Sequence, residues 1–395
     1  MKPILTLCAQ PLFDARGSPI RVLAFLRALG RAGVPVKVVT LPFGAEAALP
    51  DPVRIHRVPN IPGVRSVAIG PSFAKLVFGF LIAFRALFAA VPRRCSTVHG
   101  IEEMGLPAWG IARLTGARFV FEKHSDPASH RTGSRPRDGV MGAYRAVERF
   151  VCRRADVVIA TGPGLGGQAR SYGGRGRVRV IDDVPSSDRE PDPARTRRWR
   201  ERLPAGRAGV VFAYIGSFAA YQGVPLFLEA VRRALPGDER LRVVLVGGAE
   251  QSEAIRRLGE EGGFADRLLH IPSIPPDEVP DFLAACDVLV SPRLEGSNTP
   301  LKVLDYLRAG RCILATDTEA NRLVLDAETA RLVAPTAEAL AGAMGALAGD
   351  GALRRSLGSR GRERFDERFG FDRFRDCLLE VFREPGDPDR GGRAA

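Results

Sequence analysis

Lysine is scarce in this 395-residue sequence, which has five, at positions 2, 37, 75, 123 and 302. The other 53 of its 58 basic residues are arginines. This strong preference for arginine over lysine is typical of a compositional bias. The formal net charge of +13 therefore does not by itself indicate binding to nucleic acid. The sequence also lacks basic runs interleaved with aromatic residues. We therefore expect no nucleic-acid partner, whereas an anionic membrane surface or a phosphate-bearing substrate fits the charge.

Paired cysteines and several catalytic signatures are also missing. The six cysteines are scattered, with no C-x-x-C and no pair at metal-binding spacing. There is no Walker loop, no H-E-x-x-H, no G-x-S-x-G and no Asp-x-Asp at a predicted strand end. We expect no bound metal. We also expect a reducing cytoplasm and no signal peptide.

Long hydrophobic runs are absent, although one segment comes close. Residues 73–91 read FAKLVFGFLIAFRALFAAV, and Lys75 and Arg85 interrupt them. The uninterrupted stretch is well short of the roughly 20 residues that span a bilayer. The segment is predicted to be a helix, either buried against the fold or lying on a membrane surface. The buried alternative is favoured, and the second stays open.

Short apolar β-branched runs alternate with helical stretches, which favours buried parallel sheets. The pattern restarts near residue 209, which predicts two doubly wound units. We expect an N-terminal domain (1–185), a linker (186–208), a C-terminal domain (209–370), a helix returning to the first domain (371–384) and a loose tail (385–395). The predicted strands are 3–8, 34–40, 118–122, 156–160, 209–215, 242–246, 287–291, 312–315 and 330–333, and the predicted helices include 20–32, 225–234 and 374–382.

The segment 291–317, SPRLEGSNTPLKVLDYLRAGRCILATD, carries the strongest functional signal. It runs from a strand through a loop into a helix, with Thr299 as the expected cap and Pro300 at the first helical position. A helix N-terminus binds phosphate, and Lys302 in its first turn is best explained by an anion opposite. Asp305, one turn further, is a candidate for ribose hydroxyls, and Glu295 for sugar hydroxyls. The alternative is a capped surface helix with a solvated loop.

The segment 214–230, YIGSFAAYQGVPLFLEA, is the second signal, because Gly216 and Ser217 after a strand allow close approach to a diphosphate. Gly247 also ends a strand. In the first half, Gly17 and Ser18 follow the first strand, and His124 follows the strand in FVFEKHS. The loop HGIEE at 99–103 is a further candidate for acceptor binding. The G-x-G-x-x-G match at 162–167 follows a strand too, but Pro163 favours an ordinary loop leading into a helix over a dinucleotide site.

The segments 214–230 and 291–317 resemble the donor-binding region of glycosyltransferase family 4, in a subgroup with an NTPLK-type motif. Glu295-Gly296 matches the first acidic position of the family, and Asp305 to Gly310 (DYLRAG) matches its Glu-Ala-Met-Ala-x-Gly. Three features differ. Asp305 replaces a glutamate, and the two acids are ten residues apart, further than is usual in the family. Phe218 and Gln222 stand where the family usually has basic residues.

This resemblance implies the GT-B fold, two Rossmann-like doubly wound domains facing a central cleft. It also implies a metal-independent, retaining transfer from a nucleotide-sugar to an unknown glycan, lipid-linked or small-molecule acceptor, with no other cofactor. The residues it implies for catalysis are His124, Glu295 and Lys302. Those implied for nucleotide-sugar binding are Gly17, Ser18, Gly216, Ser217, Gln222, Gly223, Gly247, Arg293, Gly296, Asn298, Thr299, Pro300, Leu301 and Asp305.

Two alternatives stay open. A GT-B nucleotide-sugar epimerase would need acid and base residues that the sequence does not place. A non-catalytic GT-B subunit would fit the missing basic residues near Gly216. We expect a cytoplasmic enzyme of cell-envelope polysaccharide synthesis that works at the inner face of the membrane.

Overall fold

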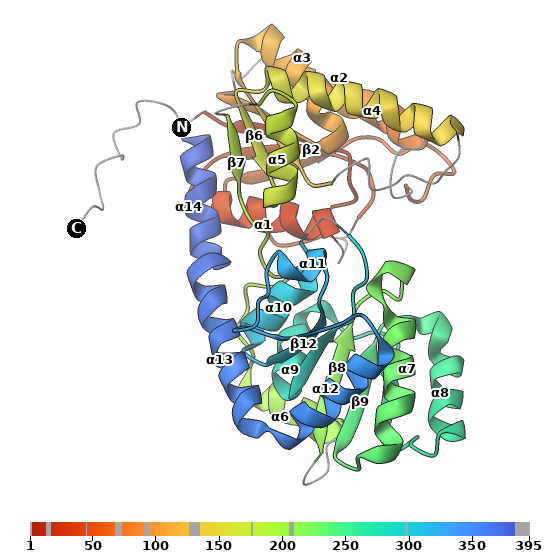
Figure 1. Cartoon of the computed structure of the whole chain (residues 1–395). Helices are drawn as coiled ribbons and strands as arrows, with labels where there is room; N and C mark the ends of the chain where they lie inside the picture. Colours follow the sequence, from red (N-terminus) through yellow and green to blue (C-terminus); the bar gives the residue numbers. More distant parts are fainter. Residues whose placement is uncertain are drawn as a thin grey trace, which may run out of the picture. The chain divides into compact units, whose positions relative to one another are not determined.

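The computed structural model describes residues 2–12, 17–44, 46–67, 73–90, 95–125, 135–174, 177–204, 209–296 and 299–383. They form two compact α/β units (Figure 1). Unit 1 comprises Met1–Val184 and the segment from Phe371 onward, and unit 2 comprises Pro185–Gly370. The expected central cleft concerns the placement of the units relative to each other and stays a prediction. The tail at 385–395 lies outside the described residues.

Unit 1 is built on a parallel seven-stranded sheet of order β3-β2-β1-β4-β5-β6-β7. Its strands are β1 Ile4–Cys8, β2 Val36–Thr40, β3 Val53–Arg57, β4 Thr97–Ile101, β5 Arg118–Lys123, β6 Val157–Ala160 and β7 Val178–Val180. Its helices are α1 Gly17–Arg31, α2 Phe73–Ala90, α3 Gly105–Thr115, α4 Arg135–Arg154, α5 Pro163–Ser171 and α14 Phe371–Phe382.

Unit 2 is built on a parallel six-stranded sheet of order β10-β9-β8-β11-β12-β13. Its strands are β8 Val210–Ile215, β9 Leu241–Val246, β10 Leu268–Ile271, β11 Val288–Ser291, β12 Cys312–Thr316 and β13 Arg331–Val333. Its helices are α6 Pro193–Arg202, α7 Val224–Ala234, α8 Ser252–Glu261, α9 Val279–Ala285, α10 Leu301–Ala309, α11 Glu319–Arg322, α12 Ala337–Gly349 and α13 Gly351–Arg368.

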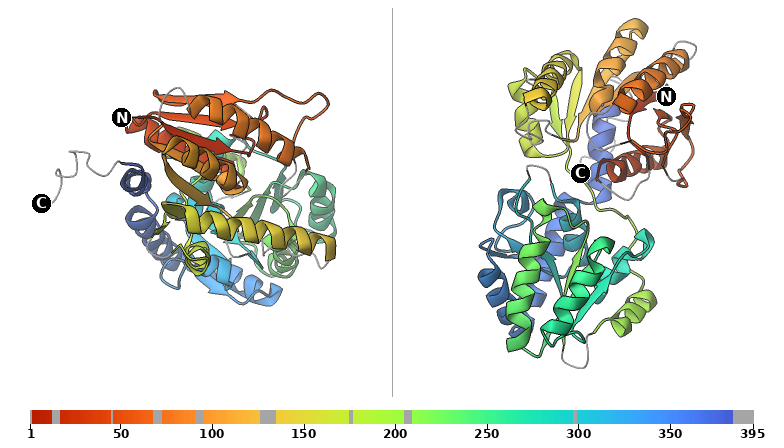
Figure 2. Two further views of the ribbon diagram at one scale, coloured as in Figure 1. Left: turned by 90° about the horizontal axis from the view of Figure 1, so that it is seen from above. Right: turned by 90° about the vertical axis from the view of Figure 1, so that its right-hand side faces the viewer.

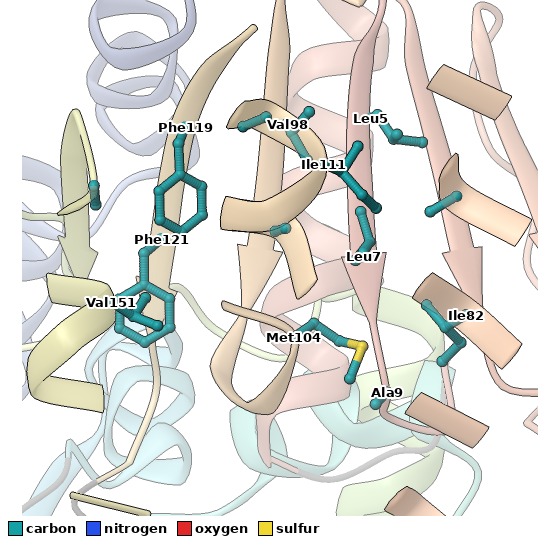
Figure 3. Packing of buried hydrophobic residues seen from close by; sticks show 14 of the residues in the cluster. Leu5, Leu7, Ala9, Ile82, Val98, Met104, Ile111, Phe119, Phe121 and Val151 are labelled. Atoms are coloured by element: carbon teal, nitrogen blue, oxygen red, sulfur yellow. The ribbon is translucent and has the colours of Figure 1, made fainter. Parts of the chain in front are cut away.

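Successive side chains of a strand point to opposite faces of the sheet, and both faces of each sheet are buried. In β1, Leu5 and Leu7 pack with α2 and α3 on one face, while Ile4 and Cys8 pack with α1 and α14 on the other. Figure 3 shows the first of these clusters, in which Phe119 and Phe121 stand on the same face of β5. Helices lie on both sides of each sheet (Figure 2). The buried parallel sheets predicted from the apolar runs are therefore confirmed.

Each sheet has a strand at which the winding reverses. β1 lies between β2 and β4, and β8 lies between β9 and β11. In open α/β sheets, ligands bind beyond the carboxyl ends of the strands at such points. The residues that follow β1, β4 and β5, and those that follow β8 and β11, are therefore placed to contact ligands.

The segment expected as a linker is largely bonded into unit 2. The Asp281 carboxylate accepts the backbone N–H of Asp192 at 2.7 Å and the guanidinium of Arg189 at 3.1 Å. Asp192 then caps α6 by accepting the N–H of Arg195 at 2.8 Å. Residues 205–208 lie outside the described part of the chain.

The G-x-G-x-x-G match has a structural role. Gly162 precedes α5, Pro163 is its first residue, and the remaining glycines of the motif lie inside the helix. A Cβ on Gly166 would lie 2.6 Å from Val180 Cγ2, so glycine there lets α5 approach β7 closely. The expectation of a loop leading into a helix is confirmed.

Candidate functional site

The loop after β8 depends on glycine backbone conformations. Gly216 has φ +144° and Gly247, after β9, has φ +113°. A Cβ on Gly247 would lie 2.1 Å from the carbonyl oxygen of Gly216, so no larger residue fits there. The two glycines bring the ends of β8 and β9 into backbone contact, and Ser217 beside them is exposed.

The loops after β8 and β11 are joined at Gly223. Gly223 has φ +71°, and a Cβ there would lie 1.9 Å from the carbonyl oxygen of Pro292. The Leu294 N–H donates to the Tyr221 carbonyl at 2.9 Å. Gln222, on the same turn, is buried. Two segments that are about 70 residues apart in the sequence therefore form one surface at the carboxyl edge of the sheet.

Lys302 lies at this edge in the first turn of α10. Its ammonium donates to the Tyr214 hydroxyl at 2.9 Å and lies 4.1 Å from the centre of that ring. A Cβ on Gly216 would lie 2.7 Å from Nζ, so Gly216 makes room for the ammonium group. Within the described part of the chain, Lys302 forms no ion pair. Burial lowers the pKa of Lys302 to about 7, and the charge of Arg293 adds to the decrease.

Arg293 is a second cation beside it, and this one is buried. Its Nε donates to the Glu295 carbonyl at 2.8 Å, and its guanidinium carbon lies 5.4 Å from the centre of the Tyr221 ring. Gly296 has φ +125°, and a Cβ there would lie 2.0 Å from the guanidinium. The Glu295 side chain is exposed. Burial lowers the pKa of Arg293.

The start of α10 differs from the prediction. The helix begins at Leu301, with Pro300 before its first residue and no side chain capping it. The expected Thr299 cap and the placement of Pro300 inside the helix are therefore wrong. The reason is that Pro300 has an extended ψ of 97°, so the helix starts one residue later. Asn298 lies outside the described residues.

Asp305 lies one turn beyond Lys302 and contacts the start of unit 2. Its Oδ1 accepts the Ser186 N–H at 2.8 Å and the Ser186 hydroxyl at 3.0 Å. Burial raises the pKa of Asp305 to about 6, although both bonds from Ser186 oppose the increase. Its predicted contact with ribose stays a prediction.

In unit 1, α1 begins at Gly17, which has φ +41°, with Ser18 after it. Arg16, before it, lies outside the described residues. Beneath α1, His124 follows β5 and contacts a buried ionic cluster. The Glu122 carboxylate is at its centre, with Arg21 Nε at 2.6 Å and His124 Nε2 at 3.2 Å. Arg21 also contacts Asp183 at 2.8 Å.

Near the cluster, the strand-end loop expected to bind an acceptor has an unusual backbone. Glu102 has φ +48°, the only non-glycine residue with positive φ in the described ranges. Its carboxylate accepts Gln10 Nε2 at 2.9 Å and the Ser125 hydroxyl at 2.6 Å. The ends of β1, β4 and β5 therefore meet at Glu102.

Sequence reasoning assigned no role to Tyr214, Arg21, Glu122 or Asp183. A signal for Glu122 was present, because Glu122 and Lys123 are charged residues within an apolar strand of a buried sheet. A charge at such a position requires a buried partner. The identity of that partner, Arg21 on α1, becomes visible only in the fold.

Two family models match the chain. Residues 16–183 match "Glycosyl transferase 4-like domain" and residues 209–350 match "Glycosyl transferases group 1". The boundary between the two matches falls where unit 2 begins. The two models together span more than three quarters of the sequence.

Characterised proteins of similar sequence are glycosyltransferases. The 2-deoxystreptamine glucosyltransferase of Streptomyces kanamyceticus is 28% identical over 69% of this chain and 74% of its own length. A GDP-mannose-dependent alpha-(1-6)-phosphatidylinositol monomannoside mannosyltransferase of Mycolicibacterium smegmatis is 27% identical over 64% of this chain and 66% of its own.

Solved structures have the same fold. A sucrose-phosphate synthase from Thermosynechococcus elongatus superposes with a TM-score of 0.77 at 23% identity, covering 97% of this chain and 98% of its own. Anabaena HepE in complex with UDP-glucose gives 0.73 at 13% identity, covering 96% and 99%. The chain belongs to the glycosyltransferases of the GT-B fold.

Proposed function

We propose that this chain transfers a sugar from a nucleoside diphosphate sugar to an acceptor, with retention of configuration and without a metal ion. The observation that carries the proposal is Lys302, a half-buried cation at the carboxyl edge of β8 with no carboxylate partner in the described ranges. A buried charge is unfavourable unless it is paired. A diphosphate would supply the missing counter-charge.

The chemistry follows from where charge develops. When the bond between sugar and phosphate breaks, the diphosphate becomes more negative and the sugar gains oxocarbenium character. Cations fixed beforehand at the diphosphate stabilise this state more than the ground state. Lys302 and Arg293 are the groups proposed for this task, with Gly216 and Gly247 allowing close backbone approach. Glu295 and Asp305 are proposed for sugar and ribose hydroxyls.

The names of similar proteins support a nucleotide-sugar donor. One relative is GDP-mannose-dependent, and one structural neighbour was solved with UDP-glucose. The acceptors in the relatives' names differ, one being 2-deoxystreptamine and the other phosphatidylinositol monomannoside. The class of donor is therefore proposed here, and the base, the sugar and the acceptor are left to experiment.

The test is a thermal-shift screen against UDP-glucose, UDP-N-acetylglucosamine, GDP-mannose, GDP and UDP, followed by turnover with the nucleotide-sugar that stabilises most. A ligand bound at 100 times its Kd raises stability by about 2.7 kcal/mol. The wild type should respond to at least one nucleotide-sugar, and Lys302→Met should not. Equal shifts in both proteins would contradict the proposed diphosphate site. Binding without any turnover would indicate a non-catalytic subunit.

We also propose that unit 1 works at a lipid surface. α2 buries Phe78, Ile82 and Ala86 against the sheet. Its opposite side exposes an apolar stripe at four-residue intervals, formed by Leu76 (59% exposed), Phe80 (70%), Phe84 (65%) and Phe88 (62%). No helix among the described residues is both long enough and apolar enough to cross a membrane. The buried alternative therefore holds for one side of the helix, and contact with a lipid surface is proposed for the other.

Such a stripe in a strongly basic chain suits the headgroup region of an anionic membrane. The wild type should co-sediment with vesicles containing anionic lipid at low salt. The double variant Phe80→Ser and Phe84→Ser should lose this binding. Leu353→Ser, which changes an exposed leucine on α13 of unit 2, is the matched control and should keep it. Equal binding by all three proteins, or none by the wild type, would rule out the stripe as the docking surface.

A further inference from the structure

Two buried histidines of unit 1 share one carboxylate. Glu122 Oε2 lies 3.0 Å from His99 Nε2, and Glu122 Oε1 lies 3.2 Å from His124 Nε2. All three side chains are almost completely buried. Each ring therefore contacts Glu122 through its own Nε2.

The second ring nitrogens differ. His99 Nδ1 lies 3.4 Å from the Thr6 hydroxyl, and its ring packs between Phe25 and Phe382, with centroids 5.0 and 5.3 Å away. Neither ring nitrogen of His124 forms a hydrogen bond in the structure as described, so Nε2 meets Glu122 as an ion-pair contact, whereas the buried Nδ1 has no such contact. The ring geometry directs Nδ1 away from Glu122. His99 is thus part of the packing, whereas His124 keeps one ring nitrogen for another molecule.

The charges around His124 come from five elements or loops. Glu122 on β5, Arg21 on α1, His99 on β4, Asp183 after β7 and Glu102 after β4 face this cluster. Burial alone would lower the pKa of His124, but the Glu122 carboxylate more than offsets this and raises it above its usual value. Burial alone would raise the pKa of Glu122, but Arg21 and His124 hold it well below its usual range.

We propose that Glu122 is a positioning residue that pairs with the imidazolium of His124 and fixes its ring, so that Nδ1–H is a charged donor to an oxygen of the bound substrate. This inference rests on the proposed sugar transfer, and it gives Glu122 a role that the sequence did not indicate. A protonated imidazole at a carboxyl strand end can donate a charged hydrogen bond to a substrate oxygen that gains negative charge during the reaction. Asp183 gives Arg21 a second carboxylate, and Glu122 Oε1 is shared between Arg21 and His124.

The test compares Glu122→Gln with Asp183→Asn in the full chain. Both changes remove one carboxylate from Arg21, but only the first removes the contact with His124. The titration of His124 is followed by NMR of 15N-histidine-labelled protein, with its signal assigned from His124→Gln. Turnover is measured across pH with the best nucleotide-sugar.

In Glu122→Gln, the His124 titration should move at least one pH unit lower. Its kcat should fall at least tenfold, and the loss of activity at high pH should begin at correspondingly lower pH, with donor KM changed less than threefold. Asp183→Asn should keep kcat within about twofold and the His124 titration within half a pH unit. An unmoved His124 titration in Glu122→Gln, or an equal shift in Asp183→Asn, would overturn the inference.

His124→Gln provides a second test if Glu122→Gln does not fold. It should reproduce the fall in kcat and remove the high-pH loss of activity, and a normal pH profile in this variant would overturn the inference. A wild type that turns over no nucleotide-sugar would end the proposed function, while the NMR titration would still report whether Glu122 controls His124.

Discussion

Lys123 in unit 1, which is buried, and Lys302 in unit 2, which is half-buried, both lie near the carboxyl edge of a parallel sheet, yet their surroundings are opposite. The Lys123 ammonium is paired with the Glu148 carboxylate and donates to the Ser125 carbonyl at 2.8 Å. The Lys302 ammonium donates to the neutral Tyr214 hydroxyl and faces Arg293. The fold supplies the counter-ion of the first lysine. We propose that a ligand supplies the counter-ion of the second, so we assign Lys302 to ligand binding and Lys123 to the stability of the fold.

The largest effect expected from this comparison is on stability in unit 1. Lys123→Met would leave the buried Glu148 carboxylate without its ammonium partner, and breaking a buried pair in this way destabilises by roughly 3–5 kcal/mol. Urea unfolding at pH 7 measures the loss. A loss below about 1 kcal/mol would show that the Lys123–Glu148 pair contributes little to stability, and it would contradict the structural role assigned to Lys123.

Lys302→Met should have the opposite pattern, a loss of donor affinity without a loss of stability. Donor affinity should fall about 10- to 150-fold, because charge-assisted hydrogen bonds worth roughly 1.5–3 kcal/mol are lost. Calorimetric titration with the stabilising nucleotide-sugar measures this loss. The unliganded variant should be at least as stable as the wild type, because it no longer holds an unpaired charge in a half-buried position. A variant as unstable as Lys123→Met would show that Lys302 is structural.

The stability difference should also depend on pH. The pKa of Lys302 is about 7 in the folded chain against 10.5 as the ordinary value, so the unfolded chain binds more protons between these pH values. Wild-type stability therefore gains from this group as pH rises from 7 towards 10.5. The advantage of Lys302→Met should be largest at or below pH 7 and should shrink above it. Urea unfolding at pH 6.5 and pH 9 measures the change, and an advantage that grows with pH would contradict the assignment.

The smallest effect is expected at Asp305. Asp305→Asn keeps an acceptor oxygen for Ser186, so thermal unfolding should change little. Loss of the carboxylate should weaken donor binding several-fold if the ribose contact exists, since a hydrogen bond to a charged group contributes about 1.5 kcal/mol. Unchanged donor affinity in calorimetry would instead assign Asp305 to holding the connection at Ser186.

Much of the fold was predictable because local patterns determine it. The runs 210–215, 241–246 and 312–316 are apolar and β-branched, so burial in a parallel sheet was readable residue by residue. The weaker strands β3, with VRIHR, and β10, with LLHI, were not predicted. They carry polar residues at the sheet edge, where an apolar run is not required.

The site was predictable only where a residue type was unusual for its position. Lys302, in the first turn of a helix, and the glycines at strand ends could be predicted as candidate site residues. The Arg21–Glu122–His124 cluster was not, because it joins residues 101 positions apart whose partnership depends on the packing of α1 over β5. The start of α10 was misplaced by one residue, since Pro300 suits both the position before a helix and its first residue.

Proton uptake on donor binding tests the central claim most directly. With a pKa of about 7, Lys302 is about 90% deprotonated at pH 8 in the free protein, and a bound diphosphate should restore its proton. Calorimetric titration with nucleoside diphosphate at pH 8, in buffers of different ionisation enthalpy, should show uptake approaching one proton in the wild type. Lys302→Met should show none at ligand concentrations that saturate it. Equal uptake in both proteins, or none in the wild type, would contradict the account of Lys302 as the cation at the diphosphate.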